Sequence, residues 1–184
     1  MRKILFIVMA LWFVTPTLMA QDKDTKEVVK KNETTGEYSY EDVVLVENVT
    51  KGVMFERAKK WIISNIVTGD NNIKFDSVTS DIVTSSSIIL KTGSGFTFGI
   101  TSGYINFKLN IQFKDGRYKF VFNGISVHAV FDEGTVKTLA YDQILKDRGS
   151  AKFIRKDVNE KLQAISTQLE NTIIKVETST NDNW

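Results

Sequence analysis

The chain has 184 residues, with 24 Lys and Arg against 22 Asp and Glu, and it contains no cysteine. The absence of cysteine excludes disulfide bonds, thiolate metal sites and a cysteine nucleophile. Two of the basic residues lie in the first 20 positions, so the rest of the chain is formally neutral. It also lacks a long basic run, which argues against nucleic acid as a partner, because binding to nucleic acid depends on contacts with phosphate.

Residues 1–20 have the pattern of a secretory signal peptide. Arg2 and Lys3 give a positive start, an apolar run follows over residues 4–14, and Ala20 is a small residue before a polar chain. The alternative is an uncleaved anchor helix, but the apolar run is shorter than the roughly 20 residues that span a bilayer. We therefore expect an exported protein, periplasmic or secreted, with a cleaved signal peptide and no stable membrane span after cleavage.

Residues 21–39 are polar and charged without periodicity, which predicts a flexible lead-in. A single α+β domain is expected over residues 40–177, followed by a polar tail over residues 178–184. The first strand is predicted at Val43–Val46. Such a continuous apolar run is typical of a strand that is central in a sheet or buried on both faces.

The first helix is predicted over residues 51–66, with Thr50 as its N-terminal cap. Six apolar side chains at helical spacing form one stripe, which predicts a helix lying on a flat apolar surface. The stripe consists of Met54, Phe55, Ala58, Trp61, Ile62 and Ile66. The aromatic side chains of this stripe are therefore expected in the core rather than at a ligand.

Two further strands are predicted before the centre of the chain. Residues 73–78 alternate between apolar and polar like a short half-buried strand, and residues 82–90 form an apolar run with a serine-rich middle. The segment Phe96–Phe98 lies between glycines and is compatible with either a short strand or a loop with aromatic tips.

The run Gly103–Val130 predicts the hairpin around which the sheet is arranged. Asp115-Gly116 lies between two alternating apolar stretches, and the two-residue turn of this type needs positive φ at both central positions. Centring the turn there places Lys114 opposite Arg117 and determines the register of the remaining pairs. The predicted inward pairs are Phe113 with Tyr118, Ile111 with Phe120 and Leu109 with Phe122, while Gln112, Asn110, Lys108 and Asn106 point to the other face.

The remaining chain is predicted to be irregular over residues 131–149, with one or two helical turns near Leu139–Leu145, and then to form a long helix capped by Ser150. The apolar residues of this helix follow one another at spacings of three and four. They are Ala151, Ile154, Val158, Leu162, Ile165, Leu169, Ile173 and Val176. This spacing permits a coiled coil as well, but a sheet is available to cover, and we expect the helix to pack on it.

Two motifs between Val43 and His128 are shared with a known family. The motifs are Thr50-Lys51, Phe55, Arg57-Ala58-Lys59 and Trp61 at the first helix, and Lys114-Asp115-Gly116-Arg117-Tyr118 at the hairpin. In these the chain resembles an exported bacterial family named domain of unknown function 4468, described as having a TATA-binding-protein-like (TBP-like) fold. The resemblance implies an antiparallel sheet with an N-terminal and a long C-terminal helix on one face. It implies no activity, and the name of the fold describes shape rather than DNA binding.

Candidate catalytic and metal-binding residues are few. His128 is the only histidine, and because the sequence provides no evident acid or nucleophile beside it, a structural role is expected. A bulge near Asn123-Gly124 would decide which way its side chain faces. Asp70-Asn71-Asn72 begins like a calcium loop, but Lys74 and Phe75 occupy positions that require a ligand and a glycine.

Three other short patterns have ordinary explanations. Lys91-Thr92-Gly93 matches one motif of serine β-lactamases without the two motifs that accompany it, and the glycines that follow fit no phosphate-binding loop. Asp132-Glu133 is expected to be a solvated loop pair. The basic group of Lys114, Arg117 and Lys119 at the hairpin tip is expected to prevent strand-to-strand aggregation.

No catalytic, cofactor-binding or metal-ligating residue is therefore assigned, and no cofactor is expected. The function expected from the sequence is that of an exported cell-envelope protein acting as a non-catalytic binding module, with an envelope protein or a small apolar ligand as its partner. Two alternatives stay open. One is a carrier with an apolar cavity between the sheet and the C-terminal helix, and the other is a hydrolase-type enzyme using His128 or loop carboxylates.

Overall fold

A computed structural model describes residues 27–66, 73–90, 100–146 and 151–175. Its strands and helices alternate in a mixed order along the chain. They are β1 (Lys30–Lys31), β2 (Tyr38–Leu45), α1 (Lys51–Asn65), β3 (Lys74–Asp76), β4 (Asp81–Ile89), β5 (Ile100–Lys114), β6 (Arg117–Phe131), β7 (Val136–Ala140), α2 (Tyr141–Lys146) and α3 (Ala151–Ile174).

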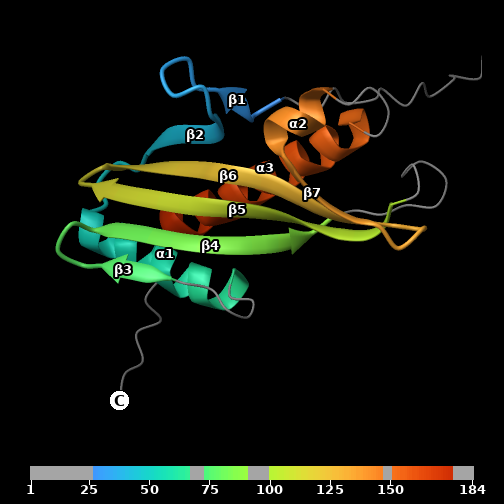
Figure 1. Ribbon diagram of the computed structural model, residues 1–184. Coiled ribbons are helices and arrows are strands. Elements are labelled where there is room, and N and C mark those ends of the chain that lie inside the picture. Colours follow the sequence, from blue (N-terminus) through green and yellow to red (C-terminus); the bar gives the residue numbers. More distant parts are fainter. Residues whose placement is uncertain (1–26, 67–72, 91–99, 147–150, 176–184) are drawn as a thin grey trace, which may run out of the picture.

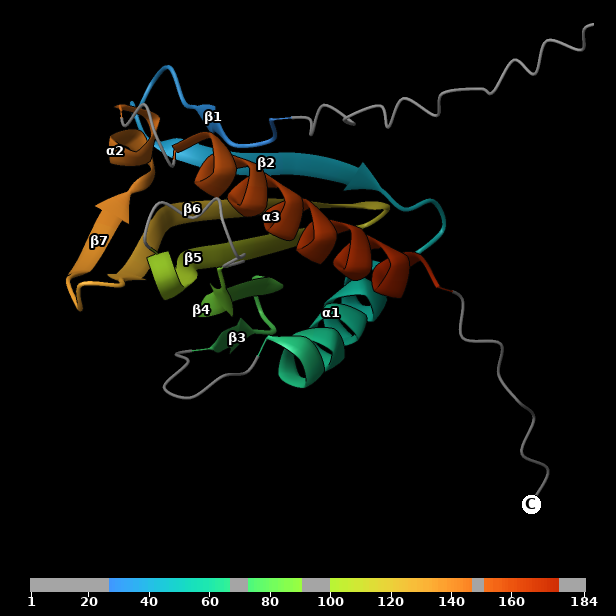
Figure 2. The ribbon, with the colours of Figure 1, turned by 90° about the vertical axis from the view of Figure 1, so that its right-hand side faces the viewer.

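The strands form one antiparallel sheet with the order β1-β2-β6-β5-β4-β3, and β7 pairs with β6 beyond the end of β2 (Figure 1). The helices α1 and α3 lie on the same face of this sheet, as Figure 2 shows, while α2 lies at the end of β7. The predicted fold class is confirmed. In the described part of the chain, no helix has the length and apolar character needed to cross a membrane.

The β5–β6 hairpin has the predicted register, with Phe113 opposite Tyr118, Ile111 opposite Phe120 and Leu109 opposite Phe122. All six side chains are buried, at 4% exposure or less. The alternation of one buried and one outward side chain along both strands follows from the turn, so the largest apolar wall of the core is determined by a short-range signal.

The turn of this hairpin also holds the start of α1. The Asp115 carboxylate accepts a hydrogen bond from the N–H of Lys51 at 2.8 Å, and the N–H of Gly116 donates to the Val49 carbonyl at 3.0 Å. Thr50 occupies the N-cap position as predicted, but its side chain makes no capping bond. The cap comes from Asp115 instead, because an unpaired N–H at a helix start accepts any well-placed carboxylate.

Replacing Gly116 by valine is expected to destabilise the domain by about 1 to 3 kcal/mol. Gly116 has a φ of 75°, which a β-branched residue adopts only with strain. An added Cβ would meet nothing within 4 Å, so the backbone strain is the whole effect. Urea unfolding measures it, with Lys114→Ala as the control, since this exposed neighbour should change stability by no more than about 0.5 kcal/mol. Equal stability of Gly116→Val and the wild type would contradict the role given to the turn.

A β-bulge in β6 decides which face its second half presents. Asn106 pairs with Ser126 and Lys108 with Asn123, so β6 has one residue more than β5 in this interval. Gly124 within it has a φ of 58°. The extra residue shifts the inward parity of β6, which is why Ile125 and the two alternate residues after it are buried.

The helices cover the sheet as their stripes predict. All six stripe residues of α1 are buried. Along α3, Ile154, Val158, Leu162, Leu169 and Ile173 are buried, and Ile165 is half-buried against the core. Because the α3 stripe is used within the domain, intramolecular packing is the correct alternative. The Arg57 guanidinium of α1 donates to the Ile173 carbonyl at 2.7 Å, where a cation compensates the negative end of α3.

The N-terminal segment corrects the expectation of a flexible lead-in, as far as residues 27–39 are concerned. Val28 and Val29 are buried, β1 follows them, and β2 begins at Tyr38. The N–H groups of both valines donate to the Asn159 side-chain oxygen, at 2.6 and 2.9 Å. No local pattern indicates this, because the partner that fixes the segment lies 130 residues away in the chain.

The strand at Val43–Val46 is also different from the prediction, since it is not buried on both faces. Val43 is 50% exposed and Leu45 is 71% exposed, while Val44 is half-buried and Val46 is buried. The run lies in β2, which pairs with β6 on one side only over this stretch. An apolar run does not reveal whether a neighbouring strand is present, and here there is none among the described residues.

Two segments differ in extent. The strand predicted over residues 73–78 is limited to Lys74–Asp76, because the Asp76 carboxylate accepts the N–H groups of Val78 and Thr79 and closes a turn. These bonds also lower the pKa of the Asp76 carboxyl. Residues 131–149, predicted to be irregular, contain the strand β7 as well as the expected helical turns of α2. The structural assignments of Phe96–Phe98 and Ser150 fall outside the described residues.

Candidate functional site

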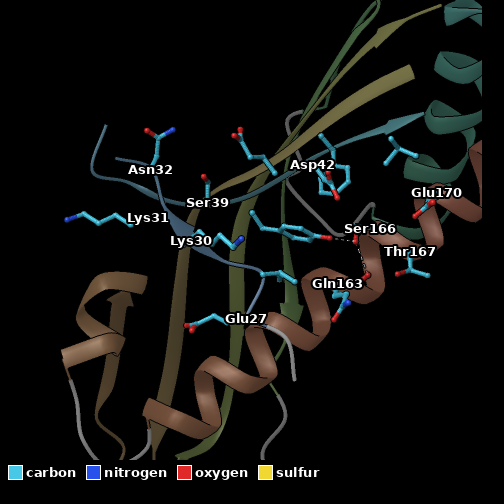
Figure 3. A pocket seen from close by; sticks show the side chains of 15 residues that line it. Glu27, Lys30, Lys31, Asn32, Ser39, Asp42, Gln163, Ser166, Thr167 and Glu170 are labelled. Atoms are coloured by element: carbon cyan, nitrogen blue, oxygen red, sulfur yellow. Dashed lines mark hydrogen bonds between the residues drawn. The ribbon is translucent and has the colours of Figure 1, made fainter. Parts of the chain in front are cut away.

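A groove of about 580 Å³ lies between the β1–β2 edge of the sheet and α3, and we call it the edge groove. Figure 3 shows it from close by, with side chains of α3 on one side and those of β2 on the other. It is lined by Glu27, Val28, Lys30, Lys31, Asn32, Ser39, Tyr40, Glu41, Asp42, Val44, Phe120, Gln163, Ser166, Thr167 and Glu170. Most of these side chains are polar or charged, so the groove presents hydrogen-bonding groups rather than an apolar surface.

The α3 side of the groove is one polar helix face. Gln163, Ser166, Thr167 and Glu170 follow at spacings of three, one and three, which places them on neighbouring turns of the same side of α3. This face adjoins the apolar stripe that packs on the sheet. Its side chains therefore stand at the boundary between core and solvent.

The β2 side is the inner surface of an edge strand. Tyr40 and Val44 are half-buried there, and the Tyr40 ring lies edge-on to Phe120 and stacks on Phe122, at centroid distances of 5.1 and 5.7 Å. The Tyr40 hydroxyl lies 3.0 Å from Ser166 Oγ, which itself donates to the Gln163 carbonyl at 2.9 Å. Since a serine hydroxyl has one proton, Tyr40 is the donor toward Ser166. This bond links the two walls of the groove.

The charges of the groove are separated along β2. Lys30 and Lys31 lie on β1, opposite Ser39 and Tyr38 at the start of β2. Asp42 lies farther along β2, and Glu170 reaches the groove from α3. At about 3.3 Å per residue, Asp42 is on the order of 10 Å from the register position of Lys30. The groove thus has a basic end and an acidic end.

Three tyrosines near the groove are held neutral by burial. Burial raises the pKa of Tyr118 strongly, and the negative charges of Glu170 and Asp42 raise it further. Burial also raises the pKa of Tyr40 and of Tyr141, although the hydrogen bond with Ser166 lowers that of Tyr40 in part. The Tyr118 hydroxyl is buried, and within the described structure it has no hydrogen-bond partner.

Replacing Tyr118 by phenylalanine is expected to raise the free energy of unfolding by about 1 kcal/mol at neutral pH, because an unsatisfied buried hydroxyl is removed without leaving a cavity. The raised pKa adds a pH dependence. The folded state favours the neutral phenol, a contribution that is complete below about pH 10 and is lost as pH rises above it. The variant should therefore lose less stability than the wild type between about pH 9 and pH 11 in urea unfolding. A lower stability of the variant at neutral pH would show that the hydroxyl has a partner.

His128 lies on the face of the sheet that the helices leave open, because the bulge at Gly124 turns its strand position outward. Its ring stacks on Tyr104 with a centroid distance of 4.5 Å and an angle of 12°, and its Nδ1 lies 3.0 Å from Thr138 Oγ1. His128 is not among the side chains that line the edge groove. The printed contacts of His128 are thus those of a cross-strand packing residue.

The other candidates of the sequence analysis lie apart from the edge groove. Asp132 lies in the β6–β7 turn, where its carboxylate accepts the N–H of Glu133 at 3.0 Å. Lys119 forms an ion pair with Glu41 at 2.8 Å, beside Arg117 and Lys114 on the open face. Within the described ranges, no cluster of three or more His, Cys, Asp or Glu side chains is placed to hold a metal ion. Asp70–Asn72 and Lys91–Gly95 lie outside these ranges.

The edge groove was missed by the sequence analysis for a physical reason. Its two walls come from residues 27–44 and 163–170, which no local rule brings together. The one available signal was the polar face of α3 at Gln163, Ser166, Thr167 and Glu170. A polar stripe beside an apolar one is also the ordinary appearance of a solvent-exposed helix side, so this signal could not distinguish the two.

The apolar carrier has a cavity of the expected size and place, but not of the expected chemistry. The edge groove adjoins the C-terminal helix, and its lining is chiefly polar. A second cavity of about 530 Å³ lies between the start of α1 and the β3–β4 turn, away from α3. The lining of the edge groove therefore favours a polar ligand over a small apolar one.

Comparisons with known proteins agree with this fold. Residues 40–128 match the model of a family described as "Domain of unknown function (DUF4468) with TBP-like fold". A TBP-like protein from Parabacteroides distasonis has a similar structure, with a TM-score of 0.66 and 16% sequence identity, covering 80% of this chain and 99% of that one. A DUF4468 family protein from Bacteroides ovatus has a TM-score of 0.61 and 14% identity, covering 85% of this chain and 98% of that one.

No curated protein matches the chain. At these identities the two solved structures show the fold alone and carry no function with them. The chain therefore resembles the DUF4468 family over residues 40–128 and has a TBP-like fold.

Proposed function

We propose that the protein is an exported, non-catalytic binding module of the cell envelope and that the edge groove is its binding site. The observation that carries the proposal is the groove itself, which combines a volume of about 580 Å³ with polar side chains from two elements. Ligand sites are concave and use a few convergent polar groups to orient what they bind. The Tyr40–Ser166 bond and the two charged ends are such groups.

Export is supported by the N-terminal sequence, with Arg2 and Lys3 before an apolar run and Ala20 before a polar chain. The intact mass of the protein purified from its native envelope tests this part. We expect a mature N-terminus at or near Gln21. Retention of Met1 would indicate an anchored protein and would contradict cleavage.

Binding at the groove can be tested with two tryptophan variants on the same helix. Thr167 is exposed and lines the edge groove, whereas its neighbour Gln168 is exposed and does not. Thr167→Trp should fill the groove, and Gln168→Trp adds the same bulk outside it. Ligands that co-purify from the native envelope, identified by mass spectrometry, should be lost with the first variant and kept with the second. Equal retention by both variants would place binding elsewhere.

A further inference from the structure

The outer edge of β2 is open beside the groove. β1 pairs with β2 only at Tyr38 and Ser39, since the chain before Lys30 turns into the layer between sheet and helix. From Tyr40 to Leu45, β2 pairs with β6 on one side. In the described structure nothing pairs with the other side. At about 3.3 Å per residue, this leaves about 20 Å of free strand edge.

The direction of the free backbone groups follows from the ladder. The N–H of Val46 donates to the Gly116 carbonyl, toward the β5–β6 hairpin. Backbone groups of alternate residues point to opposite sides of a strand, so those of Glu41, Val43 and Leu45 point away from β6. The N–H of Val43 is instead bound by the side chain of Asp42, at 2.8 Å. A strand added here would use the two other residues at once and Val43 after Asp42 moves.

The side chains along this edge alternate in chemistry. Val43 and Leu45 are exposed on the open face of the sheet, at 50% and 71%. Asp42 lies between them on the helix side, where it lines the edge groove together with Glu170. An added strand would therefore present apolar side chains outward, against Val43 and Leu45, and the side chain between them inward, toward two carboxylates.

These carboxylates are the available negative charges at this end of the groove. Glu170 is half-buried, and it forms no ion pair within the described ranges. Glu41 is already paired with Lys119 at 2.8 Å. Lys30 and Lys31 lie at the opposite end, and Glu27 precedes β1. Positive charge is thus favoured beside Asp42 and disfavoured beside β1.

We propose that the edge groove binds an extended peptide, which adds as a strand to the open edge of β2 and places a Lys or Arg side chain between Asp42 and Glu170, flanked by apolar residues. This assignment rests on the proposed function and names its ligand class. On binding, a peptide carbonyl replaces the Asp42 carboxylate at the N–H of Val43, and Asp42 then pairs with the incoming cation. Main-chain bonds supply affinity in this mode, and the inward side chain supplies specificity.

The opposing explanation is that Asp42 protects the edge against strand addition. A synthetic peptide with the core Val-Lys-Val, capped at both ends, distinguishes the two. Controls are the Val-Glu-Val peptide and a Val-Lys-Val peptide N-methylated at its bonding amides. The lysine peptide should bind at least about tenfold more tightly than either control, because one has the wrong charge and the other cannot pair. Amide hydrogen exchange at Glu41 and Leu45 should slow when it binds.

Glu170→Gln is the matched protein variant, since it removes a charge and keeps the shape. It should reduce the preference for lysine over glutamate several-fold with an unchanged thermal midpoint. Failure of the lysine peptide to bind, equal binding of the lysine and glutamate peptides, or unchanged exchange at Glu41 and Leu45 would overturn the peptide assignment. If ligand capture then still depends on Thr167 and not on Gln168, the proposed function stands with another ligand. If capture is independent of Thr167, the proposed function itself fails.

Discussion

Trp61→Ala is expected to lower the free energy of unfolding by about 3 to 5 kcal/mol, which is a large part of the stability of a domain of this size. Trp61 is 8% exposed and belongs to the α1 stripe that packs on the sheet. Its removal leaves a cavity that the surrounding β-structure cannot close. Urea unfolding at neutral pH measures the effect.

The control for this variant is Ile63→Ala on the same helix. Ile63 is 50% exposed, so its truncation removes little buried surface and should change stability by no more than about 1 kcal/mol. If Trp61→Ala had an effect as small as the control, the α1 face would be accessible in solution, and the packing of α1 on the sheet would be wrong.

Asn159→Leu is expected to lower the free energy of unfolding by about 2 to 6 kcal/mol, because two buried N–H groups lose their acceptor, at about 1 to 3 kcal/mol each. The Asn159 side-chain oxygen accepts from Val28 and Val29, and its nitrogen donates to the Tyr141 hydroxyl and the Arg155 carbonyl at 3.0 and 2.8 Å. Leucine is similar in volume, so the loss comes from hydrogen bonding. Urea unfolding and amide exchange at the two valines measure it.

Asn32 provides a matched comparison for Asn159. Its side-chain oxygen also accepts two backbone N–H groups, those of Thr34 and Thr35, at 2.9 and 3.1 Å in an exposed turn. Water replaces the lost acceptor there, so Asn32→Leu should cost less than about 1 kcal/mol. Equal effects of the two substitutions would show that residues 28 and 29 are accessible to water, and the β1 side of the edge groove would then be misplaced.

The parts of the fold that could be predicted from the sequence depend on short-range rules. The Asp115-Gly116 turn determines the register of β5 and β6 because side-chain direction alternates strictly from a known turn. The α1 stripe, with Trp61 and Phe55 buried, follows from helical spacing in the same way.

The parts that could not be predicted depend on which segments become neighbours. The apolar run of β2 indicated burial on both faces, but Leu45 is exposed because no strand lies beyond it in the described structure. β7 pairs with β6 through Val136–Ala140, a stretch with no alternation of its own. The edge groove combines both problems, since it depends on the partner that β2 lacks and on a distant polar face of α3.

Hydrogen–deuterium exchange on the protein purified with its native envelope ligand, compared with the protein freed of it, tests the binding site most directly. The account predicts slower exchange with ligand at Tyr40–Leu45 of β2 and at residues 163–170 of α3, which form the two walls of the edge groove. Protection confined instead to the open face of the sheet, around Tyr104 and His128, would contradict it.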